Sequence, residues 1–344
     1  MGHTIGITAC AISGNKGTEA MLTTALRLLK ARLPDARFVV FSYYAEKDRP
    51  LAERYPDTVV ADAGPLALVT QHLPVALFER LLGWTGLHAR GLLESTRRVA
   101  ECDLVVDVAG IAFSDGREKY LPFNVLTVLS PLWLGVGVAK MSQALGPFRH
   151  RLNRVLARWI LRQCRYVAAR GELTAEHLRA LGIDDAPRCP DIAFLLNELA
   201  DMTALDASLA DRLAFGTGER PLVGLCPSSV VFKACQPLGV DYVAVNARFV
   251  DELVRRGYRV LVLPHSQRPG TSRLKNNDLP VVERIVERAT DSEEVTALTE
   301  ELDAIDLRRV IGRCDLFVAS RFHSMVASLA MAVPTMVCGW GHKY

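Results

Sequence analysis

Arg321 and His323 lie two positions apart in the segment 320–324, which combines a permanent cation with a side chain that can carry a proton near neutral pH. The segment follows the apolar run 314–319, typical of a buried strand, and precedes the small residues 325–333, which predict a helix. Ligands of parallel sheets bind where a strand hands over to a helix. We therefore expect Arg321 and His323, together with Ser320, to bind an anion and transfer a proton. The alternative is an arginine in a surface salt bridge and a histidine that caps the helix.

A second histidine, His265, follows the apolar run 259–263 in the same half of the chain. Because both histidines come after strands of one predicted sheet, we expect them to converge on one site, with His265 as the second candidate for the acid. The alternative is a loop histidine that is hydrogen-bonded to the backbone. The polar cluster 276–278, which ends in Asp278, is expected to cap the following helix.

The turn Gly14-Asn15-Lys16-Gly17 lies between the first predicted strand, 4–11, and the first predicted helix, 20–31. Glycines let the backbone approach a ligand, and a helix N-terminus favours an anion, so Gly14, Asn15 and Gly17 are candidates for substrate binding. The turn matches neither a Walker A loop nor G-x-G-x-x-G. The alternative is a tight strand-to-helix turn.

Two further candidates for substrate binding follow strands in the first half of the chain. Arg170 comes after the apolar run 166–169, where it could bind substrate, form a cap or form a salt bridge between domains. Asp115 lies in the turn 110–116. It could accept a hydrogen bond from a sugar hydroxyl, act as a base or simply form the turn.

Composition argues against several classes of protein. The 344 residues carry a net charge of +3, which is too small to indicate nucleic-acid binding. Basic residues gather only at 149–165, mostly at helical spacing, which is more typical of a solvated helix face than of a phosphate or membrane patch. There is no C-x-x-C pair, no His/Asp/Glu cluster with ligand spacing and no G-x-S-x-G elbow, so we expect neither a metal site nor a serine hydrolase.

The start of the sequence lacks the pattern of a secretory signal. The runs 120–139 and 322–342 are uncharged but broken by prolines, so we expect buried core segments and not membrane spans. Eight cysteines without paired spacing indicate free thiols in a reducing compartment. We therefore expect a cytoplasmic protein, with peripheral contact to the inner membrane face left open.

Strand and helix patterns alternate along the chain, which predicts an α/β fold with parallel sheets. One of the expected strands is 128–138. The alternation breaks after position 195 and then restarts, so we expect domains at 1–200 and 220–344 joined by a linker at 201–219. Two Rossmann-like domains with a cleft between them are the architecture of GT-B-type glycosyltransferases, although that architecture alone fixes no chemistry.

Together these motifs resemble the polysaccharide pyruvyl transferases. The matching segments, in the order of that family, are 14–20, 142–148, 170–172, 189–194, 263–265, 277–278, 320–324 and 339–344. The resemblance implies a GT-B-like fold with the acceptor on the first domain and the donor on the second. It implies transfer of pyruvate from phosphoenolpyruvate onto two hydroxyls of a saccharide or lipid-linked saccharide, as a cyclic ketal, with release of phosphate and no cofactor. It associates Arg321 and His323 with the donor, and Arg170 less directly.

The chain departs from the family pattern at Thr18, where aspartate is frequent, and in a glycine-poor turn near position 110. Both departures concern the acceptor side. The chain stops soon after its last expected strand, so we expect a shortened C-terminal part or a fragment. Two other functions fit the same features: a GT-B glycosyltransferase that uses a nucleotide-sugar, and a non-catalytic family member in polysaccharide synthesis.

Overall fold

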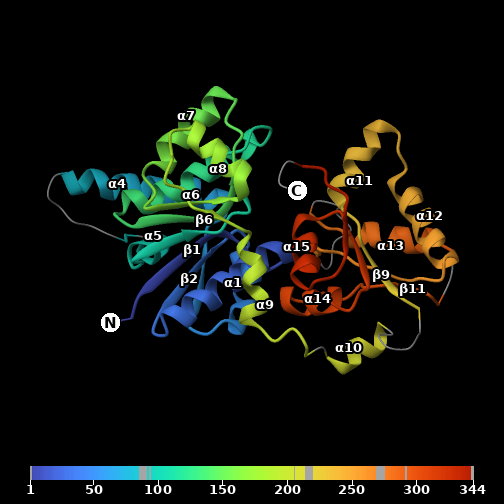
Figure 1. Ribbon diagram of the computed structural model, residues 1–344. Coiled ribbons are helices and arrows are strands. Elements are labelled where there is room, and N and C mark those ends of the chain that lie inside the picture. The colour runs from blue at the N-terminus through green and yellow to red at the C-terminus, as the bar shows by residue number, and fades with distance from the viewer. Residues whose placement is uncertain are drawn as a thin grey trace. The chain divides into compact units, whose positions relative to one another are not determined.

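The computed structural model of the protein describes residues 2–84, 91–92, 94–204, 206–213, 220–268, 276–290 and 293–341. Its contacts divide the chain into two compact units, Met1–Ser13 with Met21–Ile192, and Gly14–Ala20 with Ala193–Tyr344. Each unit holds its own parallel sheet with flanking helices (Figure 1), which confirms the expected class of two Rossmann-like α/β domains. The units change at position 192, before the expected boundary at 200. Of the expected linker, residues 205 and 214–219 lie outside the described part.

The sheet of the first unit has the strand order β3-β2-β1-β4-β6-β7-β8, and β5 pairs with β6. All of these pairs are parallel. The strands are β1 (Thr4–Cys10), β2 (Arg37–Ser42), β3 (Thr58–Asp62), β4 (Leu104–Asp107), β5 (Ile111–Ala112), β6 (Gly137–Leu145), β7 (Tyr166–Arg170) and β8 (Arg188–Cys189). The order reverses between β1 and β4, as in a doubly wound sheet.

Helices cover this sheet and contribute to its core. They are α1 (Lys16–Arg32), α2 (Ala45–Asp48), η1 (Pro50–Arg54), α3 (Pro65–Ala67), the π-helix η2 (Leu68–His72), α4 (Leu73–Trp84), α5 (Glu94–Ala100), η3 (Glu118–Tyr120), α6 (Leu121–Trp133), α7 (Arg151–Leu161) and α8 (Gly171–Ala180). Figure 1 shows α6, α7 and α8 gathered on one side of the sheet. Their buried residues Val128, Ile160 and Leu178 share one core with Val105 of β4.

The expected strand at 128–138 was wrong. α6 occupies the first part of that segment, and β6 begins only at Gly137. An uninterrupted apolar run fits a buried helix as well as a buried strand. Pro122 in the first turn of α6 favours the helix over the strand, because its fixed φ suits a helix start and its missing N–H is not needed there.

The sheet of the second unit has the order β11-β10-β9-β12-β13, again with every pair parallel. Its strands are β9 (Leu222–Cys226), β10 (Arg259–Val262), β11 (Val295–Ala297), β12 (Leu316–Ala319) and β13 (Thr335–Val337). The order reverses between β9 and β12. This reversal marks the place where doubly wound sheets bind ligands beside the carboxyl ends of their strands.

Alternate residues of β9 enter two separate cores, because successive side chains of a strand point to opposite faces. Leu222 and Cys226 pack with α10, α14 and α15, whereas Val223 and Leu225 pack with α12 and α13. Figure 1 shows these two groups of helices on opposite sides of the sheet. The helices of this unit are η4 (Ile192–Leu195), α9 (Leu196–Leu199), α10 (Ala207–Arg212), α11 (Ser229–Cys235), η5 (Gln236–Leu238), α12 (Tyr242–Arg255), α13 (Leu279–Arg288), α14 (Ala304–Ile311) and α15 (Phe322–Ala330).

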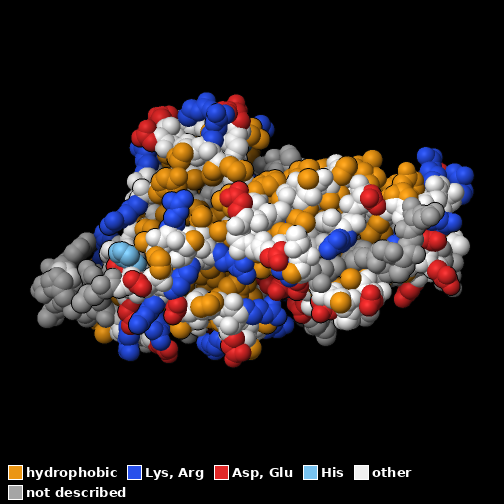
Figure 2. Space-filling view, turned by 60° about the horizontal axis from the view of Figure 1, so that its bottom comes forward, with side chains coloured by type: hydrophobic (Ala, Val, Ile, Leu, Met, Phe, Trp, Pro, Cys, Tyr) orange, Lys and Arg blue, Asp and Glu red, His pale blue; other side chains and the backbone are white. Residues whose placement is uncertain are grey.

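The surface carries charges of both signs. On the face shown in Figure 2, basic and acidic side chains are interspersed with hydrophobic ones, in line with the small net charge of +3. Among the helices that the structure describes, none combines the length and the hydropathy needed to cross a bilayer. The first uncharged run contains α6 and the start of β6, and the second contains α15 and β13. Met336 and Val337 of β13 are exposed, so the expected burial of the second run is wrong there.

Candidate functional site

The reversal point of the second sheet brings the ends of β9 and β12 together. Ser320, directly after β12, donates its backbone N–H to the carbonyl oxygen of Cys226 at the end of β9 over 3.0 Å. Arg321 follows with extended backbone, and its carbonyl accepts hydrogen bonds from the N–H and the hydroxyl of Ser324 in the first turn of α15. The strand, turn and helix predicted around Arg321 are confirmed, and the turn lies where such sheets bind ligands.

Arg321 forms a bidentate ion pair with Asp278, whose side chain is fully buried. Nε and Nη2 of Arg321 lie 2.9 and 2.5 Å from the two carboxylate oxygens, and Nη2 also donates to the hydroxyl of Ser229 over 3.1 Å. The same carboxylate accepts the backbone N–H groups of Ser229 at 2.8 Å and Ser266 at 3.0 Å. One buried carboxylate thus joins the loops that follow β9, β10 and β12.

Two expectations about these residues change. Asp278 directly precedes α13, but its side chain does not cap that helix and points to Arg321 instead. Arg321 does form a salt bridge, as one alternative held, but the bridge is buried and not on the surface. The physical reason is the same for both residues: a largely buried guanidinium needs a counter-charge with matched hydrogen bonds, and Asp278 supplies it.

The turn after β1 belongs by its contacts to the second unit, where it pairs with the loop after β10. Asn15 forms an antiparallel bridge with Ser266, and the N–H of Lys16 donates to the carbonyl oxygen of His265 over 3.2 Å. The carbonyl oxygen of Gly14, whose φ is +85°, accepts a further backbone bond of 2.9 Å from this loop. The structure therefore brings the first-turn candidates Gly14 and Asn15 next to His265, which the sequence did not predict.

Gly17 and His323 are in close contact. A Cβ atom added to Gly17 would lie 2.2 Å from Nδ1 of His323 and 2.3 Å from its Cγ, so only glycine leaves room for this ring. Asn15 fixes the turn from within, because its Oδ1 accepts the N–H of Gly17 over 3.0 Å and so caps α1. The half-buried imidazole of His323 thus lies against the N-terminal turn of α1, which favours negative charge.

His265 is buried among positive groups. Burial lowers the pKa of His265 well below its ordinary value of 6.5, and the charges of His323, Arg321, Arg308 and Lys16 lower it further. His265 is therefore neutral at neutral pH, which suits a hydrogen-bonding partner better than a proton donor. At His265 these positive groups therefore act in the same direction as burial.

The charged groups of Lys16 and Arg308 are both bound by polar partners. Lys16 Nζ lies 3.0 Å from Glu19 and 3.4 Å from Glu301. Arg308 is buried, and its Nη1 donates to the carbonyl oxygen of Ala193 over 2.8 Å and to Asn197 Oδ1 over 2.7 Å. Neither residue was a candidate from the sequence. Lys16 could have been found from its place in the glycine turn, whereas nothing local distinguishes Arg308.

The remaining candidates, Arg170 and Asp115, lie in the first unit and are held there by their own partners. Arg170 Nε donates to the carbonyl oxygen of Ser142 over 2.7 Å, and its Nη1 lies 2.7 Å from the carboxylate of buried Asp191. Burial lowers the pKa of Arg170, and the charge of Asp191 opposes that shift. Of the proposed roles, the salt bridge is realised, with a partner inside the same unit.

Asp115 caps α7. Its Oδ2 accepts the backbone N–H of Arg149 at 2.6 Å and of His150 at 3.1 Å, and its Oδ1 accepts Nδ2 of Asn153 at 2.8 Å. Burial acts to raise the pKa of Asp115, but these hydrogen bonds outweigh it and lower the pKa. A carboxylate with three donors and a lowered pKa is a weak base, so the geometry matches the turn-forming alternative.

The sequence did not reveal a buried ion pair near the reversal point of the first sheet. Lys140 on β6 is fully buried, and its Nζ lies 2.6 Å from Oδ2 of Asp107 at the end of β4. Gln143 donates to the backbone carbonyl of Asp107 over 2.9 Å. Burial, and after it the charge of Asp107, raises the pKa of Tyr43. Asp107 is the last residue of β4, where ligands of parallel sheets bind, so the sequence could have marked it as a candidate site residue. Lys140 could not be recognised in this way, because a lysine in a strand usually indicates an exposed position.

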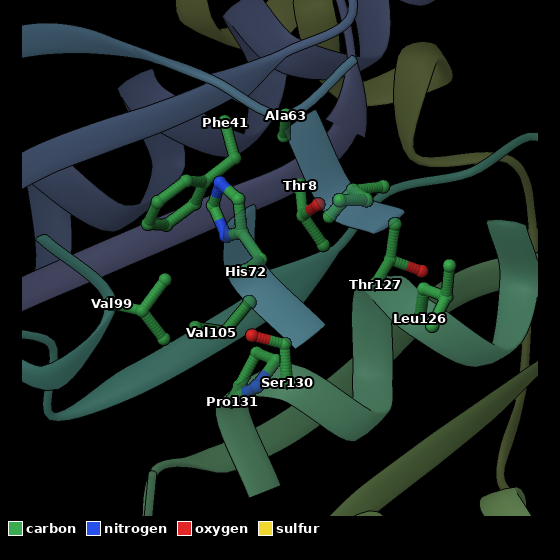
Figure 3. A pocket seen from close by; sticks show the side chains of 11 residues that line it. Thr8, Phe41, Ala63, His72, Val99, Val105, Leu126, Thr127, Ser130 and Pro131 are labelled. Atoms are coloured by element: carbon green, nitrogen blue, oxygen red, sulfur yellow. The ribbon is translucent and has the colours of Figure 1, made fainter. Parts of the chain in front are cut away.

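The described part of the first unit also contains a small cavity, which is lined by Thr8, Phe41, His72, Ser130 and neighbouring apolar residues (Figure 3). It has space for about one water molecule. No predicted site residue is among the described residues that line it, so it is a packing gap in the core. Within the described residues there is also no cluster of three or more His, Cys, Asp or Glu side chains that could hold a metal ion.

The arrangement of strands and helices is that of GT-B enzymes. The UDP-GlcNAc 2-epimerase of Methanocaldococcus jannaschii is similar with a TM-score of 0.59 and 13% identity, over 98% of this chain and 83% of that chain. Anabaena Alr3699/HepE, solved in complex with UDP-glucose, is similar with a TM-score of 0.55 and 12% identity, over 97% of this chain and 80% of that chain. At these identities the likeness establishes the fold alone.

Within that fold class, the family model of the polysaccharide pyruvyl transferases matches residues 15–342, and the chain belongs to this family. The amylovoran biosynthesis protein AmsJ of Erwinia amylovora is 21% identical over 261 residues. That match covers 73% of this chain but only 60% of AmsJ. The family suggested by the sequence motifs is therefore confirmed.

Replacing Gly17 with alanine tests its contact with His323. Because the new Cβ would overlap the imidazole, we expect Gly17→Ala to lower the free energy of unfolding by about 1–3 kcal/mol, measured by urea denaturation. Gly83→Ala in α4 is the matched control, because its Cβ would meet no atom within 4 Å, and we expect it to stabilise by up to about 1 kcal/mol. Equal effects of the two substitutions would contradict the proposed contact.

Removing Asp278 tests the buried pair. Asp278→Ala leaves the guanidinium of Arg321 without its counter-charge, so we expect a loss of about 3–5 kcal/mol in the free energy of unfolding. The double variant Asp278→Ala with Arg321→Met should lose clearly less than the sum of the two single variants. Glu252→Ala, which breaks only exposed ion pairs of α12, serves as the control and should change little. Strict additivity at positions 278 and 321 would show that the pair is not coupled.

The depressed pKa of His265 predicts a pH dependence of stability. Below pH 6.5 the unfolded state binds a proton that the folded state refuses, so stability is complete above that pH and falls as the pH decreases. His72, whose pKa is also lowered by burial, acts in the same direction. We expect His265→Asn to reduce the difference in urea midpoint between about pH 7.5 and about pH 5.5. The exposed His3→Asn is the control, and an unchanged pH dependence in His265→Asn would refute the assignment.

Proposed function

We propose that this protein transfers the pyruvyl group of phosphoenolpyruvate onto two hydroxyls of a sugar, as a cyclic ketal, in a cell-surface polysaccharide or its lipid-linked precursor. The observation that carries the proposal is the family match over residues 15–342, which includes every candidate of the second unit except Gly14. The donor is a metabolite of the cytoplasm, and the proposal places the reaction there. Arg170, which the family resemblance links less directly to the donor, and Asp115 stay predictions for substrate binding.

The charge distribution supports an anionic donor. Phosphoenolpyruvate carries a phosphate and a carboxylate, and both need cations in fixed positions. Arg321, His323 and Lys16 all act on buried His265, which indicates that they share one field. In this proposal Arg321 has two roles. Its pair with Asp278 fixes the guanidinium, and its charge contributes to the field that receives the donor.

His323 is the proposed acid. Protonation of the methylene carbon of phosphoenolpyruvate turns it into a methyl group and makes the neighbouring carbon electrophilic. One sugar hydroxyl then adds to that carbon and returns a proton to His323. The second hydroxyl displaces inorganic phosphate, which takes up the proton of that hydroxyl, and closes the ketal. His323 lies against the first turn of α1, whereas His265 stays neutral and supports the turn through its backbone. Positioned acids of this kind contribute about 10²–10⁴-fold to the rate.

The first turn has a positioning role in this scheme. Asn15 caps α1, and Gly17 gives His323 the room to lie beside the helix N-terminus. The first N–H groups of α1 are already bonded to Asn15 and to the backbone of His265, so in this proposal the terminus favours an anion through the helix dipole. Ser320 holds β12 against β9 through its backbone, so it supports Arg321.

The direct test is incubation with phosphoenolpyruvate and a panel of surface-polysaccharide precursors, followed by measurement of released phosphate. We expect His323→Gln to lower kcat by about 10²–10⁴-fold. Arg321→Lys keeps the charge but not the bidentate geometry, so it should lower turnover while preserving more stability than Arg321→Ala. His3→Gln in the first unit is the control and should leave turnover unchanged.

The same panel distinguishes the alternatives. Release of nucleotide from nucleotide-sugars, without phosphate from phosphoenolpyruvate, would identify a glycosyltransferase. The absence of both reactions, with no thermal shift on adding phosphoenolpyruvate, would identify a non-catalytic member. Full activity of His323→Gln would refute the role of the imidazole.

A further inference from the structure

Helix α7 presents an unusual outward face. Leu152, Val155 and Trp159 recur at intervals of three and four, so they share one side of the helix. Their side chains are 46–56% exposed, although the opposite side of α7 buries Ala157 and Ile160 in the core. Exposed large apolar residues normally occur singly on a protein surface, whereas three that share one helix face form a contiguous patch, which is typical of an interaction site.

A stripe of arginines runs beside this apolar stripe. It consists of Arg151, Arg154, Arg158 and Arg162, again at intervals of three and four, and all four are exposed. No acidic residue occurs in α7 or in α6, the helix that packs against it. The outward face of α7 is therefore half apolar and half cationic.

These cations are not neutralised by the described part of the protein. None of these four arginines, of which Arg162 directly follows α7, forms an ion pair with a described residue, and Arg162 donates only to the backbone carbonyl of Gly182, over 3.3 Å. Asp184 and Asp185 follow Gly182, but no salt bridge joins them to the stripe. The carboxylate of Asp115 is turned to the backbone at the start of the helix. The arginines are thus available to an external anion.

We propose that α7 docks the protein onto an anionic lipid bilayer, with the apolar stripe in the headgroup boundary and the arginines on lipid phosphates. An interfacial helix combines these features: a strongly cationic side, an apolar side that includes tryptophan, and few acidic residues. Arginine stems lie along apolar surface while their guanidinium groups reach phosphate oxygens, often in bidentate fashion. Charge complementarity selects a negatively charged surface, and the apolar stripe selects one with a hydrocarbon interior.

Another exposed apolar group of the first unit has a different composition. Leu77, Phe78 and Leu81 of α4 are 41–53% exposed, but this helix carries a single basic residue, Arg80, and no cationic stripe. The proposal therefore assigns the lipid contact to α7. Substitutions on α4 provide an internal comparison at similar exposure.

The test uses the full chain and cosedimentation with vesicles of equal parts phosphatidylglycerol and phosphatidylcholine, against vesicles of phosphatidylcholine alone. We expect binding only to the anionic vesicles, weakened by salt. Arg154→Gln with Arg158→Gln should weaken it by about fivefold for each arginine removed. Trp159→Ala should also weaken binding, and the fluorescence of Trp159 should be quenched by brominated lipid.

Matched variants control for charge and for apolar area. Lys233→Gln with Arg248→Gln removes the same charge from exposed positions of the second unit, and Phe78→Ala removes an exposed aromatic residue from α4. Both should bind as the unaltered protein does, and circular dichroism should show that every variant is folded. The proposal is overturned if the protein binds no vesicles, if it binds neutral vesicles equally well, or if only the control variants lose binding. It is also overturned if the unaltered protein is a dimer in solution and the α7 substitutions convert it to a monomer.

Discussion

One buried carboxylate organises the edge of the second sheet. Asp278 receives the guanidinium of Arg321 and two backbone N–H groups, so its charge is met by four hydrogen bonds from three loops. Burying two charges costs several kcal/mol for each, and only such complete pairing offsets that cost. Because His323 stands two residues after Arg321, its position relative to the rest of the site follows from this pair.

The same interaction gives the neighbouring groups distinct charge states. Arg321 remains charged beside Asp278, and the resulting field adds to burial in keeping His265 neutral. The turn that contains Lys16 is hydrogen-bonded to the backbone of His265, so a cation is held where it reinforces this effect. Arg321 and Lys16 are themselves paired with carboxylates, Arg321 with Asp278 and Lys16 with Glu19 and Glu301, so their buried charges are balanced within the protein.

Much of this could be predicted because it depends on local patterns. The apolar run before Arg321 and the small residues after it predicted a strand and a helix. Because the carboxyl ends of parallel strands lie at one edge of a sheet, Arg321, His323 and His265 were expected together at that edge of the second sheet. The partner of Arg321 could not be predicted, because 43 residues separate it from Asp278 and the contact depends on how three loops meet. The ion pair between Lys140 and Asp107 could not be predicted for a related reason. Lys140 is buried because the carboxylate of Asp107 on a neighbouring strand contacts it, and the sequence does not show that contact. Gly17 was recognised as permissive, but its actual role is to make room for a ring that lies far away in the sequence.

The opening turn of α1 has a consequence for exchanging parts between relatives. Gly14–Ala20 is continuous with a helix of the first unit, yet its contacts belong to the second. A chimera joined at the change of units near position 192 would therefore combine a turn from one parent with the loop at His265 from the other. The bridge between Asn15 and Ser266 and the fit of Gly17 to His323 would then be mismatched. A recombinant of this chain would keep both contacts only if the turn and the C-terminal half came from the same parent.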